Sequence, residues 1–263
     1  MKLLSRGLIV FGAFFGMWLL LAQVNFVSFL GVESIKTNTE NKIGDLIWEQ
    51  IEKAEDVIYD EEIISKLDSL LLPLCKENYI TRDSLKVHVV EKDEVNAFAL
   101  PDGHLVVYTG LILDCKNEQA LLGVLGHEIA HIENNHVMKK LSKEIGFSVL
   151  LSMTGANAQI IKEVLHSLSS SAYDRSLEKE ADMQSVNYML NAEIDPRPFA
   201  DFMYELSLDN DLHKYTYWVS THPESEDRAK YILNSLKGKK IKSKAILSQE
   251  SWEDFKQKIK DNH

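Results

Sequence analysis

The sequence predicts an α+β fold that is mainly helical, with a small β-sheet and a hairpin beside one long helix. Apolar residues recur at helical spacing over much of the chain, whereas residues 85–109 are β-rich and contain a turn sequence. The 263 residues, 45% hydrophobic and 26% charged, have the balance of an ordinary globular protein. The net charge of −11 argues against a nucleic-acid partner, because phosphate binding needs a basic face.

Residues 1–32 predict a membrane anchor or a signal segment. Lys2 and Arg6 precede an uncharged, largely apolar run, and about 20 such residues span a bilayer as a helix. An uncleaved anchor and a cleaved signal peptide both fit this pattern, the latter giving a secreted protein. The anchor is favoured, because Leu20 and Ala22 make a poor cleavage site. The positive flank is then expected in the cytoplasm and the rest of the chain outside it.

The next segments predict a linker and two helices. Residues 33–43 are polar and indicate a linker, and a first helix is expected over residues 44–58. Asp60 is a suitable cap for a second helix. The apolar face of that helix is expected to contain Ile63, Ile64, Leu67, Leu70, Leu71 and Leu74.

Three short β-rich runs predict the sheet. They cover residues 85–91, 96–100 and 105–109. Pro101-Asp102-Gly103 joins the last two as a hairpin, because Pro presets φ and Gly accepts a positive φ. His88 and His104 fall in the sheet and its turn, and we interpret both as structural or solvated.

Helices are expected again over the rest of the chain. The first begins at Asn117, which can cap it, and is expected to reach about residue 145. A charged tail is expected over residues 238–263, with a short helix near Trp252. The other predicted helices cover residues 157–168, 175–191, 197–208 and 223–236.

The helix after Asn117 carries His127-Glu128-Ile129-Ala130-His131. Four residues advance an α-helix by about 400°, so the two imidazoles lie one turn apart and about 40° around the axis. Both can therefore reach one zinc ion, and Glu128 can take a proton from the water that attacks the substrate. Gly123 and Gly126 allow another element to approach this helix closely.

A catalytic zinc ion needs a third protein ligand. His136 is nearest, but in a continuous helix it lies nine residues after His127 and about 180° around the axis. A carboxylate from another helix remains. Glu178 and Asp182 share one helical face, so Glu178 could bind zinc while Asp182 accepts the free N–H of a ligand histidine. The alternative is an ordinary solvated acidic helix.

Together these motifs resemble the HtpX-like and CaaX-prenyl-protease-like zinc metallopeptidases. The resemblance covers about residues 45–237. The matching segments, in order, are Asn-Ala-Phe-Ala-Leu-Pro-Asp-Gly-His (96–104), His-Glu-Ile-Ala-His (127–131), Tyr-Asp-Arg (173–175), Glu-Lys-Glu-Ala-Asp (178–182) and Thr-His-Pro (221–223) with Arg228.

The resemblance implies a zincin-like metalloprotease domain over residues 44–237, of the gluzincin type, with one Zn²⁺ per subunit. The implied ligands are His127, His131 and Glu178, with Asp182 behind them and Glu128 as the catalytic base. His222 would stabilise the oxyanion or occupy the water position, and Arg228 would support its segment. Asn96, Ala97 and Phe98 would form the edge strand that pairs with substrate. A capping box from Thr221 to Glu224 is compatible with either role of His222.

The expected function is a zinc-dependent metalloendopeptidase in envelope or membrane protein quality control. Its expected substrate is an unfolded or misassembled envelope protein, and its expected place is the bacterial periplasm, anchored by the N-terminus. The repeated membrane spans and the tetratricopeptide tail of other members are absent from this sequence, which favours the small single-anchor or periplasmic branch. The rivals are a membrane-anchored chaperone or scaffold with a latent metal site, and an exopeptidase.

The two cysteines, Cys75 and Cys115, fit a disulfide and two buried thiols equally well.

Overall fold

The computed structural model describes residues 32–146, 158–208 and 212–262. The chain divides into two compact units, residues 1–40 and 41–263. Of the first unit, only the start of helix α3 (Val32–Ala54) is described. The membrane segment predicted for residues 1–31 therefore lies outside the described residues. Within the described ranges, no helix combines the length and the apolar character that crossing a bilayer requires.

Helix α3 corrects two predictions. It runs through residues 33–43, so the predicted linker is helical; the segment is polar but contains no Gly or Pro to interrupt a helix. It also ends at Ala54, before the predicted end at residue 58. The chain there forms strand β1 (Val57–Ile58), which pairs antiparallel with β2. The second unit's part of α3 buries Ile43, Ile47 and Ile51, which recur every four residues.

The sheet has four strands in the order β1-β2-β4-β3. Three of them are the predicted runs: β2 (Lys86–Val90), β3 (Ala97–Ala99) and β4 (His104–Tyr108). The hairpin between β3 and β4 forms as predicted, whereas β2 pairs parallel with β4. In the hairpin turn Gly103 has a φ of +72°, and a Cβ there would lie 2.0 Å from the backbone oxygen of Ser84. Only glycine therefore fits at position 103. Strand β3 comes last in the strand order and is an edge strand.

The described helices agree closely with the sequence in the second half of the chain. Helices α10 (Arg175–Asn191) and α11 (Arg197–Leu208) have the predicted bounds. Asp60 caps α4 (Glu61–Glu77), as predicted, by accepting from the backbone N–H groups of the first turn. The remaining helices are α5 (Thr109–Asp114), α6 (Glu118–Glu133), α7 (His136–Glu144), α9 (Ala158–Ser170), α12 (Leu212–Thr221), α13 (Ser225–Leu236) and α14 (Gln249–Asp261), with a 3₁₀ turn η1 (Arg82–Ser84). The sequence did not predict α5 or α12.

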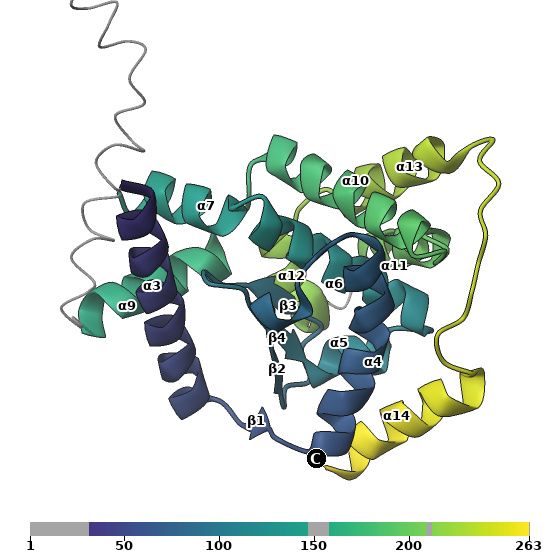
Figure 1. Cartoon of the computed structure of the whole chain (residues 1–263), viewed down its shortest axis with the longest axis horizontal. Coiled ribbons are helices and arrows are strands. Elements are labelled where there is room, and N and C mark those ends of the chain that lie inside the picture. The colour runs from purple at the N-terminus through teal and green to yellow at the C-terminus, as the bar shows by residue number, and fades with distance from the viewer. Residues whose placement is uncertain (1–31, 147–157, 209–211, 263) are drawn as a thin grey trace, which may run out of the picture. The chain divides into compact units, whose positions relative to one another are not determined.

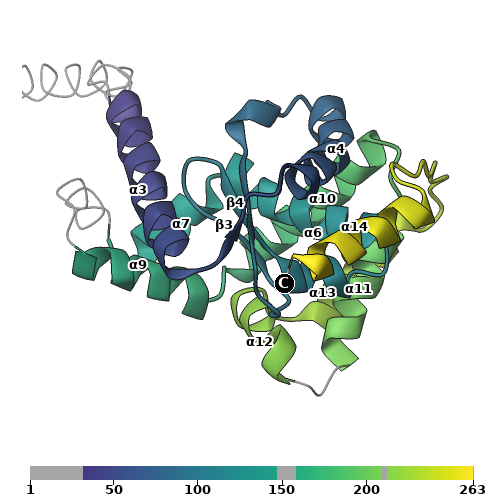
Figure 2. The ribbon, with the colours of Figure 1, turned by 90° about the horizontal axis from the view of Figure 1, so that it is seen from below.

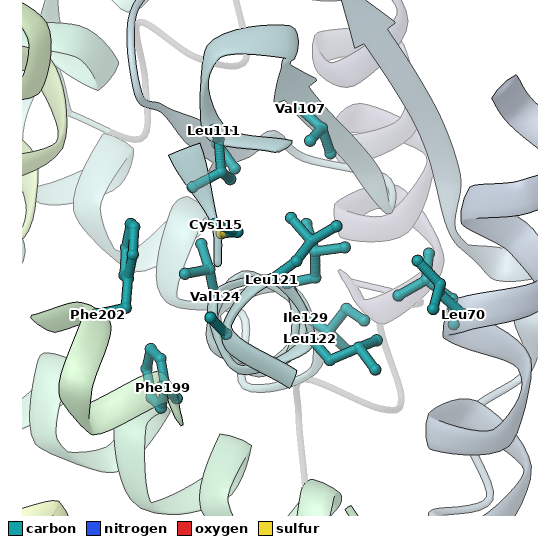
Figure 3. Packing of buried hydrophobic residues seen from close by; sticks show 14 of the residues in the cluster. Leu70, Val107, Leu111, Cys115, Leu121, Leu122, Val124, Ile129, Phe199 and Phe202 are labelled. Atoms are coloured by element: carbon teal, nitrogen blue, oxygen red, sulfur yellow. The ribbon is translucent and has the colours of Figure 1, made fainter. Parts of the chain in front are cut away.

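Helix α6 lies at the centre of this unit, between the sheet, α4, α10 and α11 (Figure 1). Seen along its axis, Leu122 and Ile129 point toward Leu70 of α4, and Phe199 and Phe202 of α11 lie on the other side (Figure 3). Almost the whole helix is buried, which explains why it is apolar on all sides. The motif carried by α6 is therefore held rigidly in the core.

The helix predicted from Asn117 to about residue 145 is two helices. Helix α6 ends at Glu133, and Asn135 adopts the left-handed conformation, with φ 55° and ψ 32°, before α7 begins. Asparagine visits this conformation more readily than most residues, so the pair Asn134-Asn135 breaks the helix. The break turns the chain and redirects His136.

The segment expected as a charged tail packs on the core. Helix α14 contacts α4 and α5, and the two views place it beside α4 (Figures 1 and 2). The Glu118 carboxylate, in the first turn of α6, accepts the backbone N–H groups of Ile246 and Leu247, each at 2.7 Å. The buried side chains of α14 are Trp252, Phe255 and Ile259.

Candidate metal centre

Four buried side chains bring a possible metal ligand atom to one point: His127, His131, Glu178 and His222. His131 Nε2 lies 3.0 Å from His127 Nε2 and 3.3 Å from Glu178 Oε1. His222 Nδ1 lies 3.3 Å from His127 Nε2 and 3.0 Å from Glu178 Oε1. The sequence predicted the first three as ligands, and the structure brings His222 into the same cluster.

Three elements supply these atoms. His127 and His131 stand on successive turns of α6, and α10 packs along α6 with Glu178 in its first turn. His222 follows α12, where its backbone N–H donates to Trp218 and its ring stacks on the Trp218 indole at 4.4 Å. The Tyr173 ring stacks in the same way on the His131 imidazole, with the ring centroids 4.0 Å apart. Aromatic packing therefore holds two of the imidazoles in place.

The spacing of the four atoms fits a zinc ion. Zn–N bonds of about 2.0–2.1 Å in a tetrahedral site place neighbouring ligand atoms about 3.3 Å apart. Four of the six separations between the cluster's ligand atoms are 3.0–3.3 Å, close to that value, and all four atoms lie within 4.8 Å of one another. Three imidazole nitrogens and one carboxylate oxygen are also ligands that zinc accepts. The cluster can hold a metal ion.

Glu128 lies beside the cluster and is fully buried. Its Oε2 accepts the backbone N–H of Ala99 at 3.0 Å. Its Oε1 has no hydrogen-bond partner among the described residues, and His222 Nε2 lies 3.4 Å away. Burial raises the pKa of this carboxyl to about 7. A carboxyl with that pKa can both take and return a proton near neutral pH.

Asp182 and Arg228 support the cluster from behind. Asp182 Oδ1 lies 2.8 Å from His127 Nδ1, as the sequence predicted for a partner of a ligand histidine. Arg228 binds both oxygens of Asp182, at 2.8 and 2.7 Å, and its Nη1 lies 2.9 Å from Glu178 Oε2. Tyr231 also donates to Asp182. Arg228 thus ties α13 to both carboxylates of α10.

Charge keeps these two carboxylates ionised in the core. Burial alone would raise the pKa of Glu178, but the charges of His222 and Arg228 hold it well below its ordinary value. Burial would likewise raise the pKa of Asp182, and Arg228 and His127 lower it. Two ionised carboxylates therefore stand beside one buried cation, Arg228, and this excess of negative charge favours a bound cation.

Sequence reasoning missed one contact. His136 is not among the four converging residues, but its Nδ1 lies 3.0 Å from His131 Nδ1. A continuous helix would place His136 on the far side of the axis, but the break at Asn135 turns its ring back toward His131. The adjacent asparagines were the signal that could have revealed the contact. The capping box from Thr221 is also wrong, since Glu224 precedes α13 in a left-handed conformation without a side-chain cap.

A cleft runs past the cluster along β3. The backbones of Asn96 and Leu100 bond to β4, so the alternate residues Ala97 and Ala99 direct their backbone groups away from the sheet. A cavity of about 290 Å³ adjoins them. Its lining includes Ile51, Asn96, Phe98, Leu165, Leu168 and His222. The buried Oδ1 of Asn96 has no hydrogen-bond partner in the described part of the chain.

The other candidate groups are structural. His88 Nε2 bonds to His104 Nδ1 at 2.9 Å, and the His88 ring stacks on Trp48 at 3.5 Å. Asp45, Asp102 and His104 also converge, but the ammonium of Lys86 lies within 3.2 Å of an atom of each and supplies the positive charge there. Cys75 and Cys115 are separate buried thiols, so of the two alternatives the structure shows free cysteines.

Comparison with known proteins identifies the family. Residues 61–235 match peptidase family M48. The chain is 32% identical to "Metalloendopeptidase OMA1, mitochondrial" of Bos taurus over 56% of this chain and 31% of that protein. It is 28% identical to "Mitochondrial metalloendopeptidase OMA1" of Arabidopsis thaliana over 73% of this chain and 39% of that protein. It is 24% identical to "Beta-barrel assembly-enhancing protease" of Yersinia pestis over 74% of this chain and 43% of that protein.

The matched region of this chain spans less than half the length of each of these relatives. The M48 match, in contrast, covers more than half of this chain and includes all four residues of the cluster. It agrees with the family resemblance that the motifs indicated. We conclude that this protein belongs to peptidase family M48.

Proposed function

We propose that this protein is a zinc metalloendopeptidase, with His127, His131 and Glu178 as zinc ligands and Glu128 as the catalytic base. The observation that carries the proposal is the placement of Glu128. Its free oxygen lies beside four converging ligand atoms, in a site where burial raises its pKa to about 7. A purely structural metal site needs no such group.

The chemistry follows from these positions. Zinc, when bound, supplies a Lewis acid that polarises the scissile carbonyl and makes water a better nucleophile. Glu128 takes the proton of the attacking water on Oε1 and later delivers it to the leaving amine. The Ala99 N–H keeps Oε2 fixed meanwhile. Asp182 holds the Nδ1 proton of His127, so that Nε2 is free to bind the metal.

His222 has the role of a movable group in this proposal. Its Nδ1 takes the place that a fourth ligand would take, next to His127 and Glu178. A catalytic zinc site keeps that place open for water. In this proposal His222 blocks that position at rest, and it moves aside before water and substrate enter. Displaced toward the substrate, the same imidazole can stabilise the oxyanion.

The substrate is a polypeptide. The outward backbone groups of Ala97 on the edge strand can pair with an extended peptide, as strand addition requires. The adjoining cavity is lined largely by apolar side chains, which suits a large apolar side chain of that peptide. The relatives' names point to mitochondria and to β-barrel assembly, which supports a role in membrane or envelope protein quality control. We place the catalytic unit outside the cytoplasm, anchored by the N-terminal segment.

The test compares Glu128→Gln with wild type for zinc content and for digestion of an unfolded protein. The variant should retain zinc and lose cleavage, because glutamine cannot accept the proton. Glu133→Gln is the matched control, since Glu133 is exposed on the same helix. Undiminished cleavage by Glu128→Gln would refute the assignment of the base. Zinc binding without cleavage by wild type would favour a chaperone or scaffold with a latent metal site.

A further inference from the structure

One more imidazole contacts the centre from outside the four converging atoms. His136 is fully buried, at 0% exposure, and its Nδ1 lies 3.0 Å from Nδ1 of His131. Its Nε2 faces Glu180, whose Oε2 lies 3.5 Å away and whose side chain is half exposed. Glu180, His136 and His131 therefore form a row that leads from the surface to the cluster.

The break between α6 and α7 produces this row. Asn135, in the left-handed conformation, donates its backbone N–H to Ile132 at 2.9 Å, and α7 starts with His136 directly afterwards. In a straight helix His136 would stand well around the axis from His131. The turn instead directs its ring back toward His131, with the ring centroids 5.0 Å apart.

The proton positions in the row follow from the side that each atom faces. His131 Nε2 faces His127 and Glu178, so this nitrogen is the one that can bind a metal, and it must carry no proton. The proton of His131 is then on Nδ1, which faces His136. His136 Nδ1 must accept that proton's hydrogen bond, so a neutral His136 carries its own proton on Nε2, toward Glu180.

We propose that His136 is a positioning residue for the ligand His131, and that Glu180 forms the outer end of the row. The inference rests on the proposed function, because it assumes that His131 binds zinc. Ligand histidines usually donate their second N–H to a fixed acceptor, which sets both ring orientation and tautomer. Asp182 does this for His127 with a carboxylate, whereas His131 has an imidazole in that place.

Burial of His136 supports the assignment. Its Nε2 is buried and has no well-formed hydrogen bond within the described residues, since the nearest acceptor is Oε2 of Glu180 at 3.5 Å. Burying an unsatisfied polar atom costs free energy, so an apolar side chain would pack here at lower cost. The benefit of histidine at this position therefore comes through Nδ1, the atom that contacts His131.

The test is the zinc affinity of the full chain, measured by competition with a chromophoric chelator. His136→Leu should bind zinc about 10–100-fold more weakly, the usual loss when the acceptor behind a ligand histidine is removed. His136→Asn should retain most of the affinity, because an asparagine oxygen can replace Nδ1. His136→Gln should not, because its amide reaches the position of Nε2. His104→Leu is the control, since it replaces a buried histidine of the sheet and should leave the affinity unchanged.

The visible spectrum of the Co²⁺-substituted protein gives a second readout, because it reports the geometry of the metal ligands. It should change in His136→Leu and His136→Gln and persist in His136→Asn. Equal zinc affinity of wild type and His136→Leu would overturn the positioning role, as would equal losses in the Asn and Gln variants. Absence of zinc binding by wild type would refute the proposed function itself, and the positioning role with it.

Discussion

The backbone N–H of Ala99 donates a hydrogen bond to Oε2 of Glu128 across 3.0 Å. Ala99 lies on the edge strand β3, so the strand proposed to receive substrate also holds the proposed base. The bond uses an outward-facing N–H that is not needed within the sheet. Binding of a peptide and alignment of the base are thus built on the same three-residue strand.

This link predicts a large effect from shortening the side chain. Glu128→Asp keeps the carboxylate but withdraws it by one methylene, so it cannot bond Ala99 and reach the attacking water together. We expect kcat to fall by roughly 10²–10⁴-fold, the usual contribution of general acid–base catalysis. Zinc content should not change. Peptide hydrolysis kinetics with metal analysis check this, and a wild-type kcat in the variant would contradict the proposed alignment.

Arg228 predicts a stability effect that depends on the metal. Arg228→Gln leaves Asp182 and Glu178 without their buried cation, and loss of one partner of a buried pair costs about 3–5 kcal/mol. Bound zinc supplies positive charge at Glu178, so the loss should be smaller in the zinc-loaded protein. Urea denaturation with and without zinc measures both values.

The control for this experiment is Lys230→Gln on the same helix. Lys230 pairs with Glu226 on the surface, so its loss should change the free energy of unfolding by about 1 kcal/mol or less. If Arg228→Gln lowered the free energy of unfolding equally with and without zinc, the arginine would act independently of the metal centre.

The cavity beside β3 predicts a defect in substrate binding. Ala54 lines the cavity from the end of α3, and Ala54→Trp would fill part of its volume of about 290 Å³. We expect kcat/KM for peptides with a large apolar residue to fall, while zinc affinity stays unchanged. Lys53→Trp is the matched control, because Lys53 is the exposed neighbour of Ala54 and does not line the cavity. Equal kinetics in both variants would exclude the cavity as a subsite.

His88 predicts a loss of stability in acid. Burial, with the nearby His104 and Lys86, lowers the pKa of His88 to about 3. The carboxylates of Asp45 and Asp102 accept hydrogen bonds from the ammonium of Lys86. An unfolded histidine takes up a proton below about pH 6.5, so between about pH 6.5 and pH 3 the unfolded state binds more protons. The free energy of unfolding therefore falls as the pH falls through this window.

His88→Gln tests this contribution, because glutamine can still bond to His104 but carries no charge. Its loss of stability between about pH 7 and about pH 5 should be smaller than that of wild type. Chemical denaturation at the two pH values gives both losses, and equal losses in the two proteins would contradict the prediction.

The two glycines of α6 predict unequal costs. A Cβ on Gly123 would lie 2.2 Å from the Cβ of Phe199, an atom that cannot move without shifting α11. A Cβ on Gly126 would meet the Ser185 hydroxyl at 2.8 Å, which can rotate away. Gly123→Ala should therefore lower the free energy of unfolding by about 1–3 kcal/mol, and Gly126→Ala by less. Denaturation of both metal-free variants measures the difference, and the reverse order would contradict the packing argument.

Features set by local chemistry were predictable from the sequence. The cap at Asp60, the bounds of α10 and α11 and the turn before Gly103 all depend on neighbouring residues. The cluster was also foreseen in large part, because two histidines one turn apart require a third ligand from elsewhere, and the family resemblance implied Glu178.

Features set by tertiary contacts were not predictable. Residues 33–43 are helical because nothing interrupts the helix that leads into the packed residues of α3, although their polarity suggested a linker. A one-residue change of conformation at Asn135 reversed the inferred direction of His136. Helix α12 carries Trp218, whose buried ring packs on His222. No periodicity in the sequence revealed that packing.

The bonds from Glu118 to Ile246 and Leu247 have a consequence for biosynthesis. The start of α6 is completed by residues made more than a hundred positions later, and His222 and Arg228 also follow the motif by a long stretch of chain. A ribosome releases the motif well before it releases these partners. A partly synthesised chain therefore exposes its histidines without the groups that fix and neutralise them, and the centre assembles only after residues 222–247 have left the ribosome.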